Sequence, residues 1–339
     1  MGQIGLFDHE NRLAELSEMG DPLEIINRVI RWKSFKPIID KPFRKERKSN
    51  AGRPPYDYVL MFKILILQTM YGLSDEQTQF QILDRLTFKR FLGLSPEDSI
   101  PDQKTIWLFR ETLTKAGVIK KLFDVFGRQL NEAGYTAQKG QIIDATFMEV
   151  PRQRNTRDEN DQIKNGETPS EWEEHPAKLR QKDVDARWVQ KNRETFFGYK
   201  NHATIDAKHK LIREFETTSA EVHESQVYEK ILDPTNTNGN VYADSAYFSE
   251  GIQKRLDELW YRSHINRKGY RNAPLSDFQQ EQNRKKSRVR ARVEHVFAQI
   301  EAMHGGIIRC IGRLRAAAKI GLLNLVYNMR RFAYLESRA

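Results

Sequence analysis

Cysteine is nearly absent from this sequence, with Cys310 as the only one among 339 residues. One thiol cannot form an internal disulfide or a thiolate metal cluster, so the sequence excludes a disulfide-framed scaffold. Long apolar stretches are also missing: residues 58–70 form the longest, contain Lys63, and are too short to cross a bilayer. Residues 1–8 lack the basic start and apolar core of a signal peptide. We therefore expect a soluble, cytoplasmic protein without a membrane partner.

Positive charge, by contrast, is in excess. The chain has 56 Lys and Arg against 46 Asp and Glu, which gives a net charge of +10 and a pI near 9.5. Such a charge attracts polyanions, of which nucleic acid is the commonest, although many basic proteins bind none. The length is sufficient for two domains, each with its own core.

Residues 1–135 show helical periodicity. Asp21 before Pro22 predicts a helix start, and Ser74 with Gln77 predicts a capping box. A loosely held lead-in is expected before residue 21. Helices are expected at residues 22–30, 56–71, 74–85, 102–117 and 118–134. Short helices in a basic chain permit a helix-turn-helix DNA reader, but any helical bundle shows the same pattern. We predict an all-helical amino-terminal domain for DNA binding or dimerisation.

Residues 41–55 interrupt the helical pattern. They contain three prolines and six Lys or Arg residues, including Arg53. A solvated loop and a flexible arm that contacts DNA phosphates are both consistent with this composition.

Residues 140–150 carry the first candidate site residue. They form a short β-rich run after Gly140, and Asp144 lies inside it although strands are depleted in Asp. A buried carboxylate requires a partner, and a divalent metal ion is one of the few that offset its desolvation. We therefore interpret Asp144 as the first ligand of a metal site.

The rest of the chain, residues 136–339, alternates strands with helices. Residues 151–194 are predicted to be a charged insert, either a loop or a mobile segment. Further strands are expected at residues 196–206, 211–218, 240–247 and 260–265, and helices at 224–232, 249–259 and in a long final region after 278. This order predicts an α/β domain whose sheet begins with antiparallel hairpins.

Two more acids complete a candidate constellation. Asp244 lies at the end of the strand at residues 240–247, and Glu294 lies beside the apolar stripe of the final helix. They follow Asp144 by 100 residues (244 − 144) and 150 residues (294 − 144). Three carboxylates without Cys or a clear His cluster suit Mg²⁺ or Mn²⁺. Two such ions can drive phosphoryl transfer by activating water or a 3′-hydroxyl.

The segment directly before Glu294 is strongly basic. Six of the nine residues from 284 to 292 are Lys or Arg: Arg284, Lys285, Lys286, Arg288, Arg290 and Arg292. Like charges at this density repel one another unless an anion offsets them, which favours DNA binding over a merely solvated helix face.

Seven short segments carry a resemblance to a known family: GRPPY at 52–56, YGLSD at 71–75, PDQKTI at 101–106, IDAT at 143–146, FGYKNH at 197–202, ADSAY at 243–247 and RARVEH at 290–295. Together they resemble the bacterial DDE insertion-sequence transposases, specifically the insertion-sequence-five group. The resemblance extends over nearly the whole chain.

The resemblance implies a fold, a site and an activity. It implies an RNase H-like catalytic domain in which Asp144, Asp244 and Glu294 form the DDE triad that holds two Mg²⁺ or Mn²⁺ ions. It implies that Arg290 contacts DNA phosphate. It further implies that the protein binds double-stranded DNA, both the terminal inverted repeats of its element and target DNA, and cleaves and joins strands as a homodimer in the synaptic complex.

The sequence departs from the family pattern at three positions. Ala246 replaces the glycine of the usual Asp-x-Gly-Tyr motif around the second acid. Ser287 and Glu301 stand where some related transposases have a tyrosine and a lysine. The DNA-contacting roles of that tyrosine and lysine therefore do not carry over to this chain.

Several residues near the motifs are candidates for supporting roles. Lys200 and His202 alternate onto one strand face, where they either line the cleft, with Lys200 contacting DNA, or decorate an exposed strand. Tyr247, His202 and His295 are predicted to support the site. Trp172 and Trp188 are expected to anchor the insert, with stacking on an unpaired base as the alternative.

Two other functions remain consistent with the sequence. One is a transposase-derived DNA-binding regulator without catalysis, and the other is an RNase H-like nuclease without strand transfer.

Overall fold

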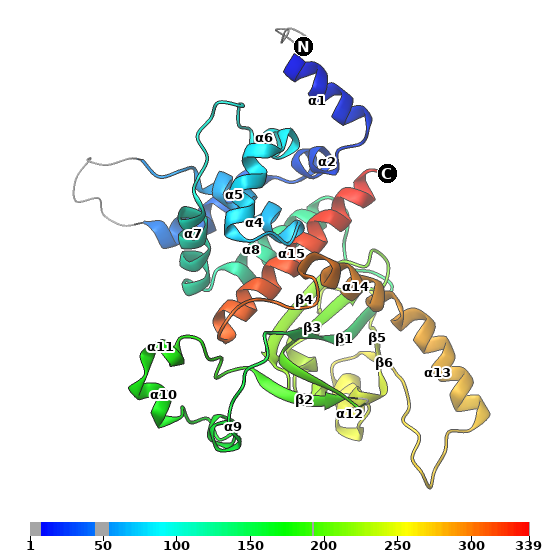
Figure 1. Cartoon of the computed structure of the whole chain (residues 1–339). Coiled ribbons are helices and arrows are strands. Elements are labelled where there is room, and N and C mark those ends of the chain that lie inside the picture. The colour runs from blue at the N-terminus through cyan, green and yellow to red at the C-terminus, as the bar shows by residue number, and fades with distance from the viewer. Residues whose placement is uncertain (1–7, 45–53, 192, 339) are drawn as a thin grey trace. The chain divides into compact units, whose positions relative to one another are not determined.

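The computed structural model describes residues 8–44, 54–191 and 193–338 (Figure 1). Contacts divide the chain into two compact units, which we call the helical unit (residues 1–129 and 325–339) and the sheet unit (residues 130–324). The predicted domain boundary between residues 135 and 136 stays a prediction. No helix of the described ranges is long and apolar enough to cross a membrane.

The helical unit is built from short helices with the predicted start signals. The elements are α1 (Asp8–Glu18), α2 (Pro22–Val29), η1 (Trp32–Phe35), α3 (Lys36–Asp40), η2 (Lys41–Phe43), α4 (Tyr58–Met70), α5 (Asp75–Asp84), α6 (Leu86–Leu92), α7 (Gln103–Lys115), most of α8 (Ile119–Glu132) and the end of α15 (Arg313–Glu336). The Asp21 carboxylate accepts from Leu23 N, and Ser74 with Gln77 forms the capping box. The helical prediction is confirmed.

One local expectation for the helical unit was wrong, and one helix was missed. The expected loose lead-in contains helix α1, which buries none of its side chains. Helix α6 was not predicted, and its left-handed end at Gly93 is the type of stop signal that could have revealed it. Arg53 and residues 45–52 lie outside the described residues.

The sheet unit contains a six-stranded mixed sheet in the order β2–β3–β1–β5–β6, with β4 also paired to β3. The strands are β1 (Gln141–Glu149), β2 (Arg187–Lys191), β3 (Glu194–Asp206), β4 (Ile212–Ser219), β5 (Asn240–Ala243) and β6 (Arg262–Ile265). Strands β1, β3 and β4 pair antiparallel, whereas β5 and β6 run parallel to β1. This is the predicted RNase H-like mixed sheet with flanking helices, and the α/β prediction is confirmed.

Strand β3 is long enough to pair with three neighbours. Its first residues pair with β2, and its later residues pair with β1 and β4. Gly198 lies where the pairing changes, at a φ of +149°. A Cβ atom there would collide with the carbonyl oxygen of Met148, so this position requires glycine.

The two faces of the sheet are covered differently. One face buries an apolar cluster that includes Ile143, Val241 and Ala243, against η3 (Glu224–Gln226), η4 (Tyr228–Ile231) and α12 (Glu250–Glu258). Asp144 is adjacent to Ile143 in β1 and therefore points to the opposite face. Helix α14 (Arg292–His304) contacts β1.

Three expected elements of the sheet unit differ in the structure. Residues 224–232 form the 3₁₀ helices η3 and η4 instead of an α-helix. The long final helix is divided at Ala291 into α13 (Asp277–Arg290) and α14, and α15 follows as a third helix. The insert folds into α9 (Arg157–Lys164), α10 (Ser170–Glu174) and α11 (Pro176–Leu179), followed by β2.

The insert has a small core of its own around Trp172. This side chain is fully buried, its Nε1 donates to Glu159 Oε1 at 2.6 Å, and the Lys182 ammonium lies 4.9 Å from its ring. Trp188, in contrast, lies half-exposed on β2 against the Phe197 ring. The insert was predicted to lack such structure because its composition is polar.

Trp172→Ala is expected to unfold the insert locally. Truncating a buried tryptophan costs about 3–5 kcal/mol, more than so small a core can lose. Limited proteolysis should therefore cut the variant rapidly within residues 151–186 while the rest of the chain resists. Trp188→Ala is the matched control, and equal cleavage of both variants would contradict the assigned core.

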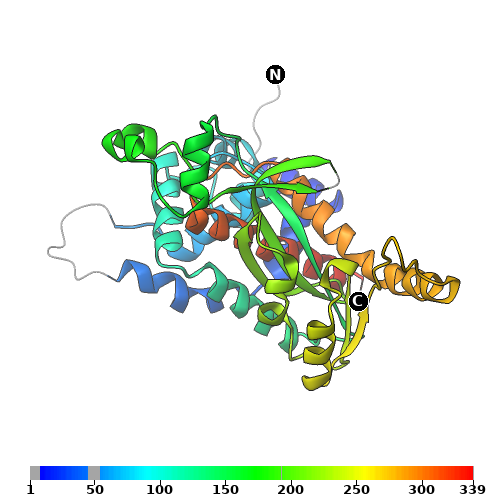
Figure 2. The same cartoon turned by 90° about the horizontal axis from the view of Figure 1, so that it is seen from below.

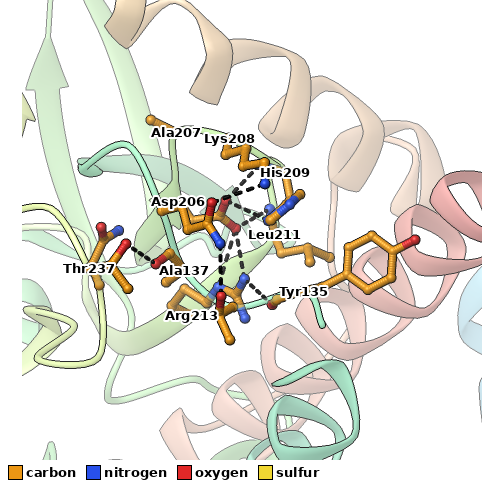
Figure 3. Close-up of polar contacts among 12 residues, drawn as sticks. Tyr135, Ala137, Asp206, Ala207, Lys208, His209, Leu211, Arg213 and Thr237 are labelled. Carbon is orange, nitrogen blue, oxygen red and sulfur yellow. Dashed lines mark hydrogen bonds and ion pairs between the residues drawn. The ribbon is translucent and has the colours of Figure 1, made fainter. Parts of the chain in front are cut away.

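Asp206 organises the turn between β3 and β4 (Figure 3). Its fully buried carboxylate accepts hydrogen bonds from His209 N at 2.6 Å and Leu211 N at 3.2 Å. It also pairs with the Arg213 guanidinium at 3.1 Å, and Arg213 in turn donates to the carbonyl of Tyr135 at 2.7 Å. The turn is thus held by one buried charge pair and its hydrogen bonds.

Asp206→Asn is expected to destabilise the protein strongly. The substitution leaves the buried Arg213 charge without its partner, which costs about 3–5 kcal/mol. For a unit of this size each kcal/mol lowers Tm by about 2–4 °C, so a fall of roughly 10 °C is expected in a thermal melt. Lys208→Gln, on the exposed side of the same turn, should leave Tm within about 1 °C, since such surface changes are small.

Candidate active site on strands β1 and β5

The pairing of β1 with β5 places the first two candidate acids side by side. Gln141 is opposite Val241 and Ile142 is opposite Tyr242, an offset of 100 residues (241 − 141). The same offset leads from Asp144 to Asp244, just beyond the last paired residues. Neighbouring strands lie about 4.8 Å apart, and opposed residues of parallel strands point to the same face. The two carboxylates therefore lie side by side on one face of the sheet.

The charged form of the Asp144 carboxylate is destabilised by burial. Its side chain is only 16% exposed, and its Oδ1 accepts from Ala145 N at 2.9 Å. Burial is the main cause that raises the pKa of Asp144 to about 6, and the charge of Asp244 raises it further. The hydrogen bond from Ala145 and the charge of Arg290 act in the opposite direction. A buried carboxylate in this state gains from any added positive charge.

Asp244 is oriented by the chain that follows it. The residue caps the 3₁₀ helix η5 (Ser245–Tyr247), and its Oδ1 accepts from Ala246 N at 2.8 Å. The amide at position 246 makes this contact, so alanine at the expected glycine position retains the hydrogen bond. The departure at Ala246 therefore does not disturb the cap.

Arg290 connects the third acid to the first. The helix division at Ala291 makes Arg290 the last residue of α13, and Glu294 lies in the first turn of α14. One guanidinium nitrogen of Arg290 lies 2.8 Å from Asp144 Oδ2, and the other lies 3.6 Å from Glu294 Oε1. Glu294 is 65% exposed, so it faces Asp144 across the guanidinium from the solvent side.

The donor chemistry of this site suits a divalent metal ion, but the carboxylates are not gathered around one point. Within the described ranges no group of three His, Cys, Asp or Glu side chains is close enough to form a metal cage. Arg290 supplies the positive charge between Asp144 and Glu294 instead. The oxygen donors fit Mg²⁺ or Mn²⁺, and a metal ion would have to replace the guanidinium as counter-ion.

Lys200 and His202 are buried, on the sheet face opposite to Asp144. Lys200 donates to the Val222 carbonyl at 2.8 Å and pairs with Glu224 at 3.1 Å. His202 Nε2 lies 2.9 Å from Thr218 Oγ1, and burial lowers the pKa of His202 to about 4. Both side chains are thus neither on an exposed strand surface nor on the face that carries Asp144, and a DNA contact by Lys200 is not compatible with this placement.

Tyr247 extends the candidate site toward the buried face. Its side chain is almost fully buried, and its hydroxyl has no hydrogen-bond partner among the described residues. Burial raises the pKa of Tyr247 far above its usual range, and so do the charges of Asp144, Glu224 and Asp244. The hydroxyl thus lies within the influence of two candidate ligands. The position of Glu224 near Tyr247 and Lys200 was not predicted, because no local sequence pattern indicates it.

The remaining predicted residues lie on α13 and α14. His295 is exposed, next to Glu294. Arg292 donates to the carbonyl of Ala207, in the β3–β4 turn, and Lys286 donates to the carbonyl of Ile265 at 2.9 Å. The side chains that point to solvent are Arg284, Lys285 and Arg288.

A cavity of about 190 Å³ lies between β1 and α14. Thr146 and Glu149 line it from β1, and Phe297, Glu301 and His304 line it from α14. Glu301 is one of the three residues that depart from the family pattern, and it follows Glu294 by about two helical turns. An acidic residue here makes this end of the cavity less attractive to phosphate than a lysine would.

Two family models match this chain. Residues 135–329 match the family described as "Transposase DDE domain", and residues 11–112 match "Transposase domain (DUF772)". Among solved structures, the chain is similar to one titled "Cryo-EM structure of piggyBac transposase synaptic complex with hairpin DNA (SNHP)", with 14% sequence identity and a TM-score of 0.49. That match covers 94% of this chain and 76% of the other. The narrower resemblance to the insertion-sequence-five group stays a prediction. Because the first family model spans more than half of its residues, this chain belongs to the DDE transposase family.

Proposed function

We propose that this protein is a DNA transposase that binds the terminal inverted repeats of its own element and catalyses metal-dependent cleavage and strand transfer. Asp144, Asp244 and Glu294 form the catalytic triad. The observation that supports this proposal is the register of β1 with β5, which brings Asp144 beside Asp244, together with the Arg290 contacts to Asp144 and Glu294.

Each acid of the triad has a distinct part in the proposed site. Asp144 and Asp244 would hold metal ions from one face of the sheet, and Glu294 would complete the ligand set from the exposed side of α14. When bound, two Mg²⁺ or Mn²⁺ ions supply activation of the attacking oxygen and stabilisation of the leaving oxygen. Arg290, released from the carboxylates, contacts a DNA phosphate. Tyr247 lies close enough to influence both aspartates.

A strand-transfer assay tests the proposal. A labelled terminal repeat is incubated with the protein, Mg²⁺ and a target duplex, and cleaved and joined products are separated. Cleavage followed by joining supports the transposase. Binding without metal-dependent cleavage would identify a DNA-binding regulator, and cleavage without joining would identify a nuclease. Size measurement of the complex with DNA tests the proposed homodimer, for which two protein copies per complex are expected.

The affinity for Mn²⁺ is expected to fall steeply below about pH 6. Asp144 has a raised pKa of about 6, so it becomes protonated below that pH and a metal ion must displace the proton. Each pH unit below the pKa then weakens binding by up to about tenfold. Isothermal titration with Mn²⁺ at several pH values checks this. An affinity that stays constant from about pH 7.5 to pH 5 would contradict Asp144 as a ligand.

A further inference from the structure

Residues 266–290 form a projecting segment that we call the basic arm. It consists of the loop after β6, residues 266–276, and helix α13. Figures 1 and 2 both show α13 extending away from the sheet of its own unit. Not one side chain of α13 is buried. The arm therefore contributes little to a hydrophobic core.

Polar contacts hold the loop of the arm along its helix. Asn283 accepts from Arg267 N and donates to the Arg267 carbonyl, both at 3.0 Å. Asn266 donates to Ser287 Oγ at 3.0 Å, and Lys286 donates to the carbonyl of Ile265 at 2.9 Å. These contacts define a two-sided hairpin of loop and helix. Its shape is thus specified although no core requires it.

The charge of the arm is almost entirely positive. It carries eight basic residues (Arg267, Lys268, Arg271, Arg284, Lys285, Lys286, Arg288, Arg290) and two acidic residues (Asp277, Glu281), a net charge of +6 in a chain of +10. Arg284 pairs with Glu281 at 3.5 Å, and Arg290 is held at the candidate site.

Most of these charges are unpaired. Across the described ranges, no ion pair involves Arg267, Lys268, Arg271, Lys285 or Arg288, and all five side chains are exposed. Charges of one sign at this density repel one another and favour an anionic partner.

Two exposed aromatic rings accompany the charges. Tyr270 is 60% exposed in the loop, where the Lys268 ammonium lies 5.9 Å from its ring, and Phe278 is 73% exposed at the start of α13. Basic side chains interleaved with exposed aromatic rings are typical of nucleic-acid-binding surfaces.

We propose that both sides of the basic arm grip the phosphate backbone of the DNA duplex next to the cleavage site. The arm ends at Arg290, which contacts Asp144, so DNA bound along it leads into the candidate site. Helix α13 has 14 residues and is about 21 Å long, which corresponds to roughly six base pairs at 3.4 Å each. The loop with Arg267, Lys268 and Arg271 forms the second side. The inference rests on the proposed function for the position of the cut.

The salt dependence of binding tests the loop side of the arm. The triple variant Arg267→Gln, Lys268→Gln, Arg271→Gln is compared with wild type on a fluorescent random-sequence duplex, by anisotropy at several salt concentrations. The slope of log Kd against log salt concentration should fall by about 0.9 for each lost phosphate contact, or by roughly 2–3 in total. The pair Lys285→Gln, Arg288→Gln should lower it by roughly 2. An unchanged slope in either variant overturns the proposal that both sides grip the backbone.

A charge-matched control separates contact from overall charge. Lys164, Lys230 and Lys254 are exposed residues of the sheet unit outside the arm. The triple variant Lys164→Gln, Lys230→Gln, Lys254→Gln removes the same charge and should leave the slope within about 0.5 of wild type, far less than one contact each. An equal fall in the control overturns the proposal. All variants should melt as wild type does, since none removes a buried side chain.

The test does not depend on catalysis. An arm-dependent slope in a protein that fails to cut its terminal repeat would contradict the proposed function and support the arm. Normal cleavage of the terminal repeat together with an unchanged slope in one or both arm variants would support the proposed function and contradict the proposal for the arm. Asp144→Asn protein serves for binding to terminal repeats, because it should bind DNA without cutting it.

Discussion

Asp144→Asn and Asp244→Asn should each lower Mg²⁺-dependent cleavage of a terminal repeat by about 10³-fold or more, equivalent to about 4 kcal/mol of transition-state stabilisation. Each substitution keeps the size of the side chain and removes a negative charge. In phosphoryl transfer, most of the acceleration comes from positioned charges, and the register of β1 with β5 makes these two carboxylates the fixed part of the site. Glu294→Gln should have the same direction of effect.

Binding and cleavage must be measured together on these variants. Binding to the same repeat should stay within about threefold of wild type, or about 0.65 kcal/mol, because neither aspartate is expected to contact phosphate directly. Glu149→Gln is a suitable control, since it removes a carboxylate from the same strand, where Glu149 pairs with Arg152 at 3.6 Å. Full cleavage by Asp144→Asn, or equal loss in Glu149→Gln, would contradict the assigned site.

The sequence predicted the sheet and the position of its acids because these depend on local pattern. An acid inside a β-rich run marked Asp144, and another at the end of a strand marked Asp244. Both signals arise from residue propensities that act over a few positions. The fold class was equally accessible, since the order of strands and helices constrains how a sheet can form.

Burial was harder to predict than strand position. Period-two alternation correctly placed Lys200 and His202 on one face of β3, but it cannot show whether that face is covered. Helices η3 and η4 cover it, and Glu224 neutralises Lys200 at 3.1 Å. Such cover comes from residues distant in sequence, so it has no local signature.

The contact of Arg290 with Asp144 could also not be predicted from the sequence. The two residues are 146 positions apart, and the helix division at Ala291 makes Arg290 the last residue of α13. The family resemblance assigned Arg290 to DNA phosphate, whereas the structure pairs it with a candidate ligand. Both roles are compatible if a metal ion replaces Arg290 as the partner of Asp144 and a DNA phosphate replaces Asp144 as the partner of Arg290.

In the absence of metal ions, Arg290→Gln is therefore expected to lower the stability of the protein. The loss is expected only at a pH where Asp144 is charged. Burial raises the pKa of Asp144 from 3.8 to about 6, so ionisation of Asp144 weakens the folded state as pH rises from about 4 through 6. Arg290 lowers that pKa, so its removal makes the penalty above pH 6 larger. Below about pH 6, Asp144 is mostly neutral in both the folded wild type and the folded variant, so the difference in stability between the two proteins disappears.

The size of this effect follows from the geometry of the pair. Arg290 is 23% exposed and Asp144 is 16% exposed, at 2.8 Å, so the loss lies between those of surface and fully buried pairs, about 2–3 kcal/mol. Thermal melts should show Tm lowered by roughly 5–10 °C at about pH 7.5 and by at most about 2 °C at about pH 5. Adding Mn²⁺ at pH 7.5 should restore Tm, because a bound ion replaces the missing positive charge. Arg288→Gln removes an exposed arginine from the same helix end and should change Tm at neither pH. A loss that is equal at both pH values, or that Mn²⁺ does not reverse, would show that Arg290 supports the fold by packing and does not act as the counter-ion of the candidate metal site.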